Sequence, residues 1–133
     1  MDEAIRYVLL GDPIPLARAR HGNRKTYDIQ REVKLVQGIE LARQHDGRPF
    51  YEGPVIMHIT FFLPIPTANS LKRKEAMRNS PHIYKPDLSN LIKFIEDIGT
   101  GILYKDDCII YEIISKKMYD TQPRTEFTIL EFQ

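Results

Sequence analysis

The sequence has one cysteine, no long apolar run and almost no net charge. Because Cys108 has no partner in the chain, a disulfide scaffold is excluded, and a lone thiol fits a reducing compartment. No apolar run approaches the roughly 20 residues of a membrane span, and the first residues do not form a signal peptide. We therefore expect a cytoplasmic protein without membrane contact. The net charge of +1 argues, taken alone, against a strongly basic nucleic-acid binder.

Motifs of several enzyme classes are also missing. The sequence has no Walker motif, no dinucleotide-binding glycine pattern and no nucleophile elbow, and its histidines show no metal-ligand spacing. What is present is a chain of 133 residues of which 42% are hydrophobic, enough for the core of one domain. We expect Cys108 to pack within a strand of that domain.

Along the chain, the charges separate by sign. The stretches 18–31 and 72–85 each hold five bases and one acid, whereas 96–112 holds five acids and one base. Two basic stretches combined with an acidic cluster are typical of a metal-dependent nuclease, because Lys and Arg hold phosphates while carboxylates hold the cation. Chance clustering of surface charge, with a solvated helix at 72–78, is the alternative interpretation.

Hydrophobic periodicity predicts four strands and two main helices. The strands are expected at 6–10, 55–63, 107–117 and 125–132. The helices are expected at 28–44, with Asp28 as N-cap, and at 87–98. In the first helix, apolar residues recur at helical spacing: Val33, Leu35, Val36, Ile39 and Leu41.

The segments between these elements predict an irregular loop at 14–25 and an exposed insertion at 67–82 that contains a short basic helix. Together the elements predict an α+β fold: a small mixed β-sheet of about four strands covered by two main helices, in a single domain over residues 1–133.

The helix at 87–98 has one apolar face and one polar face. Its apolar residues are Leu88, Leu91, Ile92, Ile95 and Ile98, and its polar residues are Asp87, Asn90, Lys93 and Asp97. A lysine beside carboxylates can stabilise charge on a phosphate, and Asp87 together with Asp107 could hold Mg²⁺. An ordinary amphipathic helix with an i,i+4 Lys93–Asp97 pair, and a turn role for the Asp106–Asp107 pair, remain open.

One motif makes the sequence recognisable. It reads Lys85-Pro86-Asp87-Leu88-Ser89-Asn90-Leu91-Ile92-Lys93, followed by Asp97 and by Gly101-Ile102-Leu103-Tyr104-Lys105-Asp106-Asp107, with Lys117 near the end of the next strand. This pattern resembles the signature of the RusA family of Holliday-junction resolvases, small endodeoxyribonucleases of bacteria and prophages.

The resemblance implies roles for individual residues. Asp87, Lys93 and Asp107 would be catalytic, and Asp87, Asp107 and Asp106 would bind Mg²⁺, with Mn²⁺ as the alternative ion. Asn90, Asp97 and Ser89 would support them. The implied partner is a four-way junction or other branched DNA used in recombination and repair, cut by a homodimer in the cytoplasm.

Ser89 departs from the family pattern, which commonly has a second aspartate at this position. A hydroxyl is a poorer Mg²⁺ ligand than a carboxylate. Three outcomes remain open: Asp106 or Asp97 completes the metal site, the activity is weaker or more selective, or the chain binds branched DNA without cutting it. Besides a nuclease and a non-catalytic DNA-binding protein, a third hypothesis is a structural or assembly protein of phage origin whose acidic cluster binds a partner.

Basic and aromatic residues extend the expected DNA surface. The bases that would contact DNA are Arg18, Arg20, Arg24, Lys25, Lys72, Arg73, Lys74, Lys85 and Lys117. The aromatic residues that would stack at the branch point are Tyr27, Phe50 and Tyr84.

Overall fold

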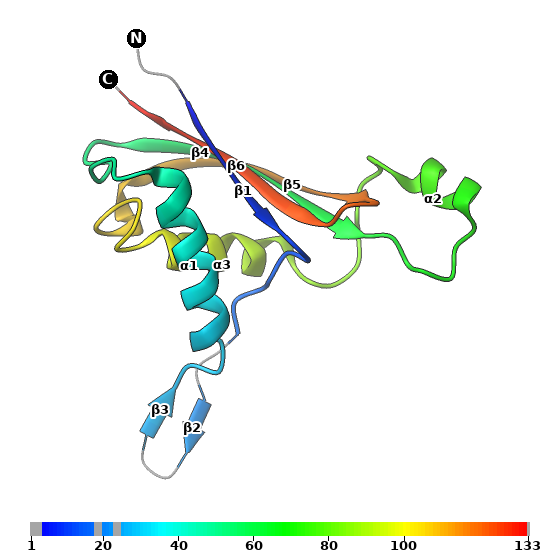
Figure 1. Ribbon diagram of the computed structural model, residues 1–133, viewed down its shortest axis with the longest axis horizontal. Helices are drawn as coiled ribbons and strands as arrows, with labels where there is room; N and C mark the ends of the chain where they lie inside the picture. Colours follow the sequence, from blue (N-terminus) through cyan, green and yellow to red (C-terminus); the bar gives the residue numbers. More distant parts are fainter. Residues whose placement is uncertain (1–3, 18–19, 23–24, 133) are drawn as a thin grey trace.

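A mixed sheet of four strands organises the chain (Figure 1). The computed structural model describes residues 4–17, 20–22 and 25–132. The strand order is β1 (Ile5–Leu10), β6 (Arg124–Glu131), β4 (Val55–Pro64) and β5 (Ile110–Asp120). β4 runs parallel to β5, whereas β6 is antiparallel to both β1 and β4. The α+β fold expected from the sequence is confirmed.

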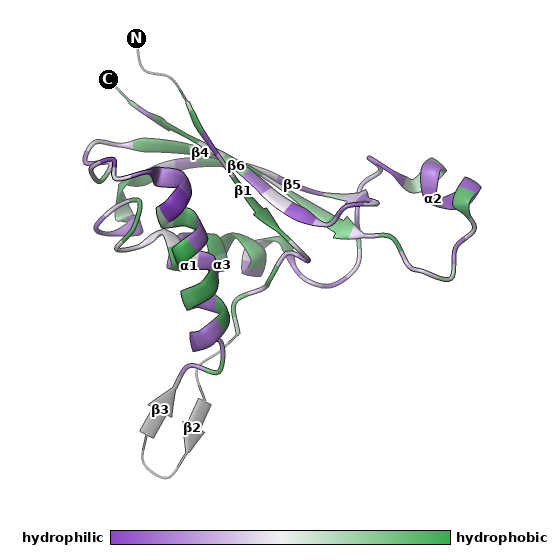
Figure 2. Cartoon of the chain, viewed as in Figure 1, coloured by the Kyte–Doolittle hydropathy of each residue, from purple (hydrophilic) through white to green (hydrophobic). Residues whose placement is uncertain are grey.

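One face of this sheet carries the core. Along β4 the side chains alternate strictly, so that Val55, Met57, Ile59, Phe61 and Leu63 are all buried on the same face. Two helices cover that face, α1 (Arg31–His45) and α3 (Leu88–Gly99) (Figure 1). Helix α3 contributes most of the helical core residues: Leu91, Phe94, Ile95 and Ile98. Figure 2 shows hydrophobic and hydrophilic residues along α3, as expected of an amphipathic helix.

Helix α1 is present, but only some of the apolar residues at helical spacing face the core. Of the five, Leu41 is buried and Val33 packs against the core, while Leu35, Val36 and Ile39 are exposed. The buried stripe consists of Gly38, Leu41 and His45. Helical spacing places residues on a common face, but it does not say which face meets the sheet.

Three predictions of local structure were wrong. Residues 14–25 are not one loop, because β2 (Arg20–Gly22) and β3 (Lys25–Tyr27) pair as an antiparallel hairpin. The N-cap of α1 is Gln30, and Asp28 instead accepts a hydrogen bond from the Gln30 backbone N–H at 2.8 Å. Before β5 lies a single 3₁₀ turn, η1 (Asp107–Ile109), which exposes Cys108.

The insertion at 67–82 does contain a short helix, α2 (Leu71–Met77). Ser70 caps it by accepting a hydrogen bond from the Arg73 backbone N–H at 3.2 Å. Helix α2 has no buried residue and lies beyond the end of β4, apart from the other helices (Figure 1). Across the part of the chain that the structure describes, no helix is both long and apolar enough to cross a membrane.

Candidate nuclease site

Asp87 stands at the N-terminus of α3, where the sequence motif begins. It occupies the N-cap position, but its carboxylate does not hydrogen-bond to the first turn. Instead the Lys85 ammonium donates to Asp87 Oδ1 at 2.9 Å. This hydrogen bond, reinforced by the charge of Lys85, lowers the pKa of Asp87. The Asp87 carboxylate is therefore ionised and exposed at neutral pH.

The loop that leads to Asp87 is fixed to β5 by Lys117. The Lys117 ammonium donates to the Tyr84 carbonyl at 2.7 Å and to the Pro86 carbonyl at 2.8 Å. The peptide bond between Lys85 and Pro86 is cis. Further back, the His82 backbone N–H donates to the Lys117 carbonyl at 3.1 Å. Lys117, which we expected to contact DNA, thus orients the backbone in front of Asp87.

The polar face of α3 points outward as the sequence predicts. Lys93 and Asp97 are exposed, Asn90 is half-buried, and Ser89 is exposed beside Asp87. The Asn90 carbonyl accepts a hydrogen bond from the Leu16 backbone N–H at 2.9 Å, which ties the helix to the segment after β1. The Lys93 amine and the carboxylates of Asp87 and Asp97 are therefore all exposed to solvent along α3.

Four carboxylates gather at the other end of α3, and we call them the acidic group: Glu96, Asp97, Asp106 and Asp107. Burial raises the pKa of Asp107 first, and the hydrogen bond and charge of Asp106 together with the charge of Asp97 raise it further. Burial and the charge of Asp107 likewise raise the pKa of Glu96, while Lys93 offsets part of that rise. Crowded carboxylates of this kind favour a bound cation.

Two members of the acidic group are already engaged. Asp106 caps η1, since its Oδ1 accepts a hydrogen bond from the Cys108 backbone N–H at 2.9 Å, and this bond lowers the Asp106 pKa. Asp97 pairs with the Lys34 ammonium of α1 at 2.8 Å. Lys34 also pairs with Asp28, so one lysine joins the start of α1 to the end of α3. Asp97, for which the resemblance implies a supporting role, therefore contacts Lys34 of α1.

Asp87 and the acidic group lie at opposite ends of α3. From Asp87 to Asp97 the helix rises about 15 Å at about 1.5 Å per residue. Among residues 4–17, 20–22 and 25–132, no group of three or more His, Cys, Asp or Glu side chains is close enough to hold a metal ion. One chain therefore brings Asp106 and Asp107 together but separates them from Asp87.

The basic stretches lie on two sides of α3. The hairpin β2–β3 and helix α2 project far apart, with α3 between them in the view of Figure 1. Lys72, Arg73 and Lys85 are exposed and Lys74 is half-buried. Arg18 and Arg24 lie outside the described residues, while Arg20 and Lys25 are placed on β2 and β3 by their backbone.

Comparison with known sequences decides the family. The family described as "Endodeoxyribonuclease RusA" matches residues 11–130. The chain belongs to the RusA family. It is also 29% identical over 138 residues to the "Uncharacterized protein YqaN" of Bacillus subtilis (strain 168), a match that covers 97% of each chain. RusA membership makes the chain a hydrolase of the endodeoxyribonuclease type and supports Holliday-junction resolution as its reaction.

Within this RusA fold, the sequence did not reveal every residue that shapes the site. Lys34 lies 63 positions before Asp97 and carries no motif, so their ion pair could not be predicted. Tyr104 is buried, and its hydroxyl donates to the Glu96 carbonyl at 2.9 Å, fixing the last turn of α3 against the acidic group. Glu96 itself was visible from the sequence as part of the acidic stretch.

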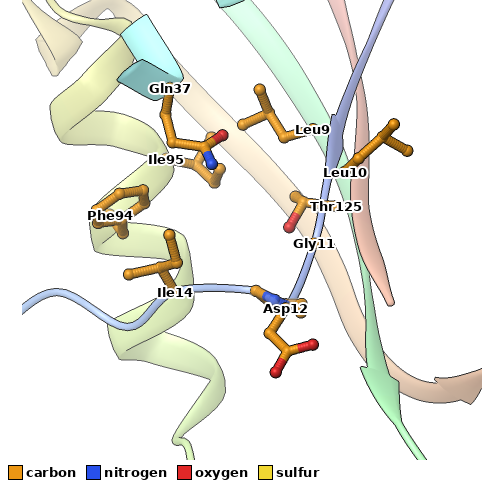
Figure 3. A pocket seen from close by; sticks show the side chains of 10 residues that line it. Leu9, Leu10, Gly11, Asp12, Ile14, Gln37, Phe94, Ile95 and Thr125 are labelled. Atoms are coloured by element: carbon orange, nitrogen blue, oxygen red, sulfur yellow. The ribbon is translucent and has the colours of Figure 1, made fainter. Parts of the chain in front are cut away.

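A small hollow lies between the end of β1 and α3 (Figure 3). Its volume of about 10 Å³ is enough for roughly one water molecule. Apolar side chains such as Ile14, Phe94 and Ile95 line it, and Asp12, its one acidic residue, points away from them (Figure 3). This hollow is therefore a packing feature of the RusA fold, separate from the candidate nuclease site.

Proposed function

We propose that this chain is a Mg²⁺-dependent endodeoxyribonuclease that cuts Holliday junctions and other branched DNA. The observation that carries the proposal is the outward surface of α3 in a RusA-family chain, with Asp87 at one end, the acidic group at the other and Lys93 between them. Lys93 and the exposed bases of α2 supply positive charge for the phosphate backbone.

The donor chemistry of these residues fits a hard cation. Asp106 and Asp107 offer carboxylate oxygens at one end of α3 and Asp87 offers them at the other, and these are the ligands that Mg²⁺ prefers and that Mn²⁺ also takes. Burial and then the neighbouring Asp106 and Asp97 carboxylates raise the pKa of Asp107, and a bound cation would offset the charge of these carboxylates. When bound, the ion would supply charge stabilisation at the scissile phosphate and a more acidic water.

Asp107, Lys93 and Lys117 would each have a separate role in the reaction. Asp107 would act as a carboxylate ligand of the cation, because a bound positive charge favours its ionised form despite the burial and neighbouring charges that raise its pKa. The Lys93 ammonium is placed to stabilise negative charge that develops on the phosphate. Lys117 and the loop that it holds orient Asp87.

A homodimer is part of the proposal. A four-way junction is two-fold symmetric, and its resolution needs paired cuts in two strands. A chain of 133 residues offers one candidate site, so two copies related by a two-fold axis would supply the pair.

A second function, binding of branched DNA without cleavage, is favoured by one specific observation. Ser89 stands where the family commonly has an aspartate, so the N-terminal end of α3 offers one carboxylate fewer for a cation. Activity and binding must therefore be measured separately.

The test compares carboxylate variants on a labelled four-way junction with and without Mg²⁺. We expect Asp87→Asn and Asp107→Asn to reduce the cleavage rate at least 100-fold while binding persists. Asp46→Asn is the matched control, because Asp46 is exposed at the left-handed end of α1, outside the acidic group, in a conformation that Asn also adopts. Tight binding without product under any metal would instead favour the non-catalytic function.

Ser89→Asp probes the departure from the family pattern. If Ser89 weakens the metal site, restoring the acid should raise the cleavage rate or lower the Mg²⁺ concentration needed for half-maximal cleavage. An unchanged Mg²⁺ dependence would show that this position does not contact the ion.

A further inference from the structure

Helix α1 presents an apolar patch to solvent, which we define as Leu35, Val36 and Ile39. These side chains are 64%, 62% and 63% exposed, respectively. The helix is anchored to the core through its other side, so the patch is not a loosely packed part of the core. Adjacent exposed apolar residues on one helix are typical of an interaction surface, whereas single ones are not.

Two charged residues, Glu32 and Arg43, lie in one row with the apolar residues Val36 and Ile39 of this patch. Glu32, Val36, Ile39 and Arg43 follow the spacing i, i+4, i+7, i+11, which places them in one row along a helix. All four are exposed or half-exposed to solvent on α1. The row thus begins with an acid, has two apolar residues in the middle and ends with a base.

Hollows flank the patch on both sides. One, of about 420 Å³, lies between α1 and Leu10 at the end of β1, and Leu10 is itself 78% exposed. The other, of about 450 Å³, lies between α1 and the end of α3 with Ile102. A ridge with a groove on each side is the surface that a second helix packs against.

We propose that α1 packs antiparallel against α1 of a second copy of this chain, around a two-fold axis near the middle of the row. In this register Val36 of each copy meets Ile39 of the other. Glu32 of each copy then meets Arg43 of the other, so the row complements itself in charge as well as shape.

This self-complementarity identifies the occupant as a second copy, because an unrelated helix would not need an acid and a base at equal distances from the centre. The Arg43 guanidinium now pairs within its own chain with Glu40, and a second acid would join it. The inference rests on the proposed function in that it supplies the surface for the dimer, but its test requires no DNA.

The mass of the native protein in solution tests the proposal directly. Light scattering after size exclusion at micromolar concentrations should give a two-chain particle, and Ile39→Glu should give a single chain with an unchanged circular dichroism spectrum. Leu71→Glu is the control, because Leu71 is 86% exposed on α2 and its replacement should leave the dimer intact. A monomeric native protein, or an Ile39→Glu dimer, would overturn the proposal.

Charge exchange tests the antiparallel register. Glu32→Arg and Arg43→Glu should each weaken the dimer at least tenfold, because like charges would then face each other. The double variant E32R/R43E should dimerise nearly as tightly as the native protein. If the double variant is weaker than either single variant, the register is wrong. Loss of cleavage with an intact dimer would count against the proposed function and leave this interface standing.

Discussion

Lys117 holds the loop in front of Asp87, and its replacement has a calculable effect. Lys117→Met keeps most of the side-chain stem but removes the donors to the Tyr84 and Pro86 carbonyls, at 2.7 and 2.8 Å. Hydrogen bonds from a charged group contribute about 1.5–3 kcal/mol each, and partial exposure reduces this to about 1 kcal/mol each. We therefore expect the free energy of unfolding to fall by about 2 kcal/mol, or roughly 6–8 °C in Tm for a domain of this size.

The measurement is urea denaturation of Lys117→Met beside Lys116→Met. Lys116 is the neighbouring lysine, exposed on the opposite face of β5, so its loss should change stability by less than about 0.5 kcal/mol. Junction cleavage by Lys117→Met should also fall, because Asp87 loses the support of its loop. Equal stability of the two variants would refute the structural role given to Lys117.

Three further changes test contacts around α3. Lys34→Met removes the ion pair with Asp97 and should lower the free energy of unfolding in urea by about 1 kcal/mol, with a smaller effect in 1 M salt. An unchanged free energy of unfolding at low salt would contradict a stabilising role of this ion pair. Gly99→Ala places a Cβ 2.5 Å from the Tyr104 hydroxyl and should cost about 2–3 kcal/mol in thermal unfolding. The pKa of Asp107 is raised in the folded protein, so protonation of this carboxyl stabilises the fold. This contribution to the free energy of unfolding is fully present below the ordinary pKa of 3.8 and is lost as the pH rises through the raised pKa. Without metal, Asp107→Asn should therefore gain stability relative to the native protein between pH 4 and 7, by about 0.5 kcal/mol, and a constant difference over this range would refute the cause given for the shift.

The elements that depend on local pattern could be predicted from the sequence. Helix α3 has strong amphipathic periodicity and begins after a proline, and the alternation in β4 matches its buried face. The polar face of α3, with Lys93 and Asp97 exposed, was likewise a local consequence of helical geometry.

What depends on packing between distant segments could not be predicted. The apolar residues of α1 have helical spacing, but the face that meets the sheet is set by Gly38, which lies close to Ile102, and by Leu41. The number of residues between Asp87 and Asp107 likewise did not predict how far apart they lie in space. That distance follows from the direction of α3 and the position of η1 after it.

Cleavage of a synthetic four-way junction, beside a linear duplex of the same sequence, tests the central claim most directly. With Mg²⁺ the native protein should nick two opposed strands of the junction at symmetric positions and leave the duplex intact, and chelation of the metal should stop the reaction. No product from the junction with Mg²⁺ or Mn²⁺, despite salt-sensitive binding, would contradict the account. Equal cutting of the linear duplex would contradict its preference for branched DNA.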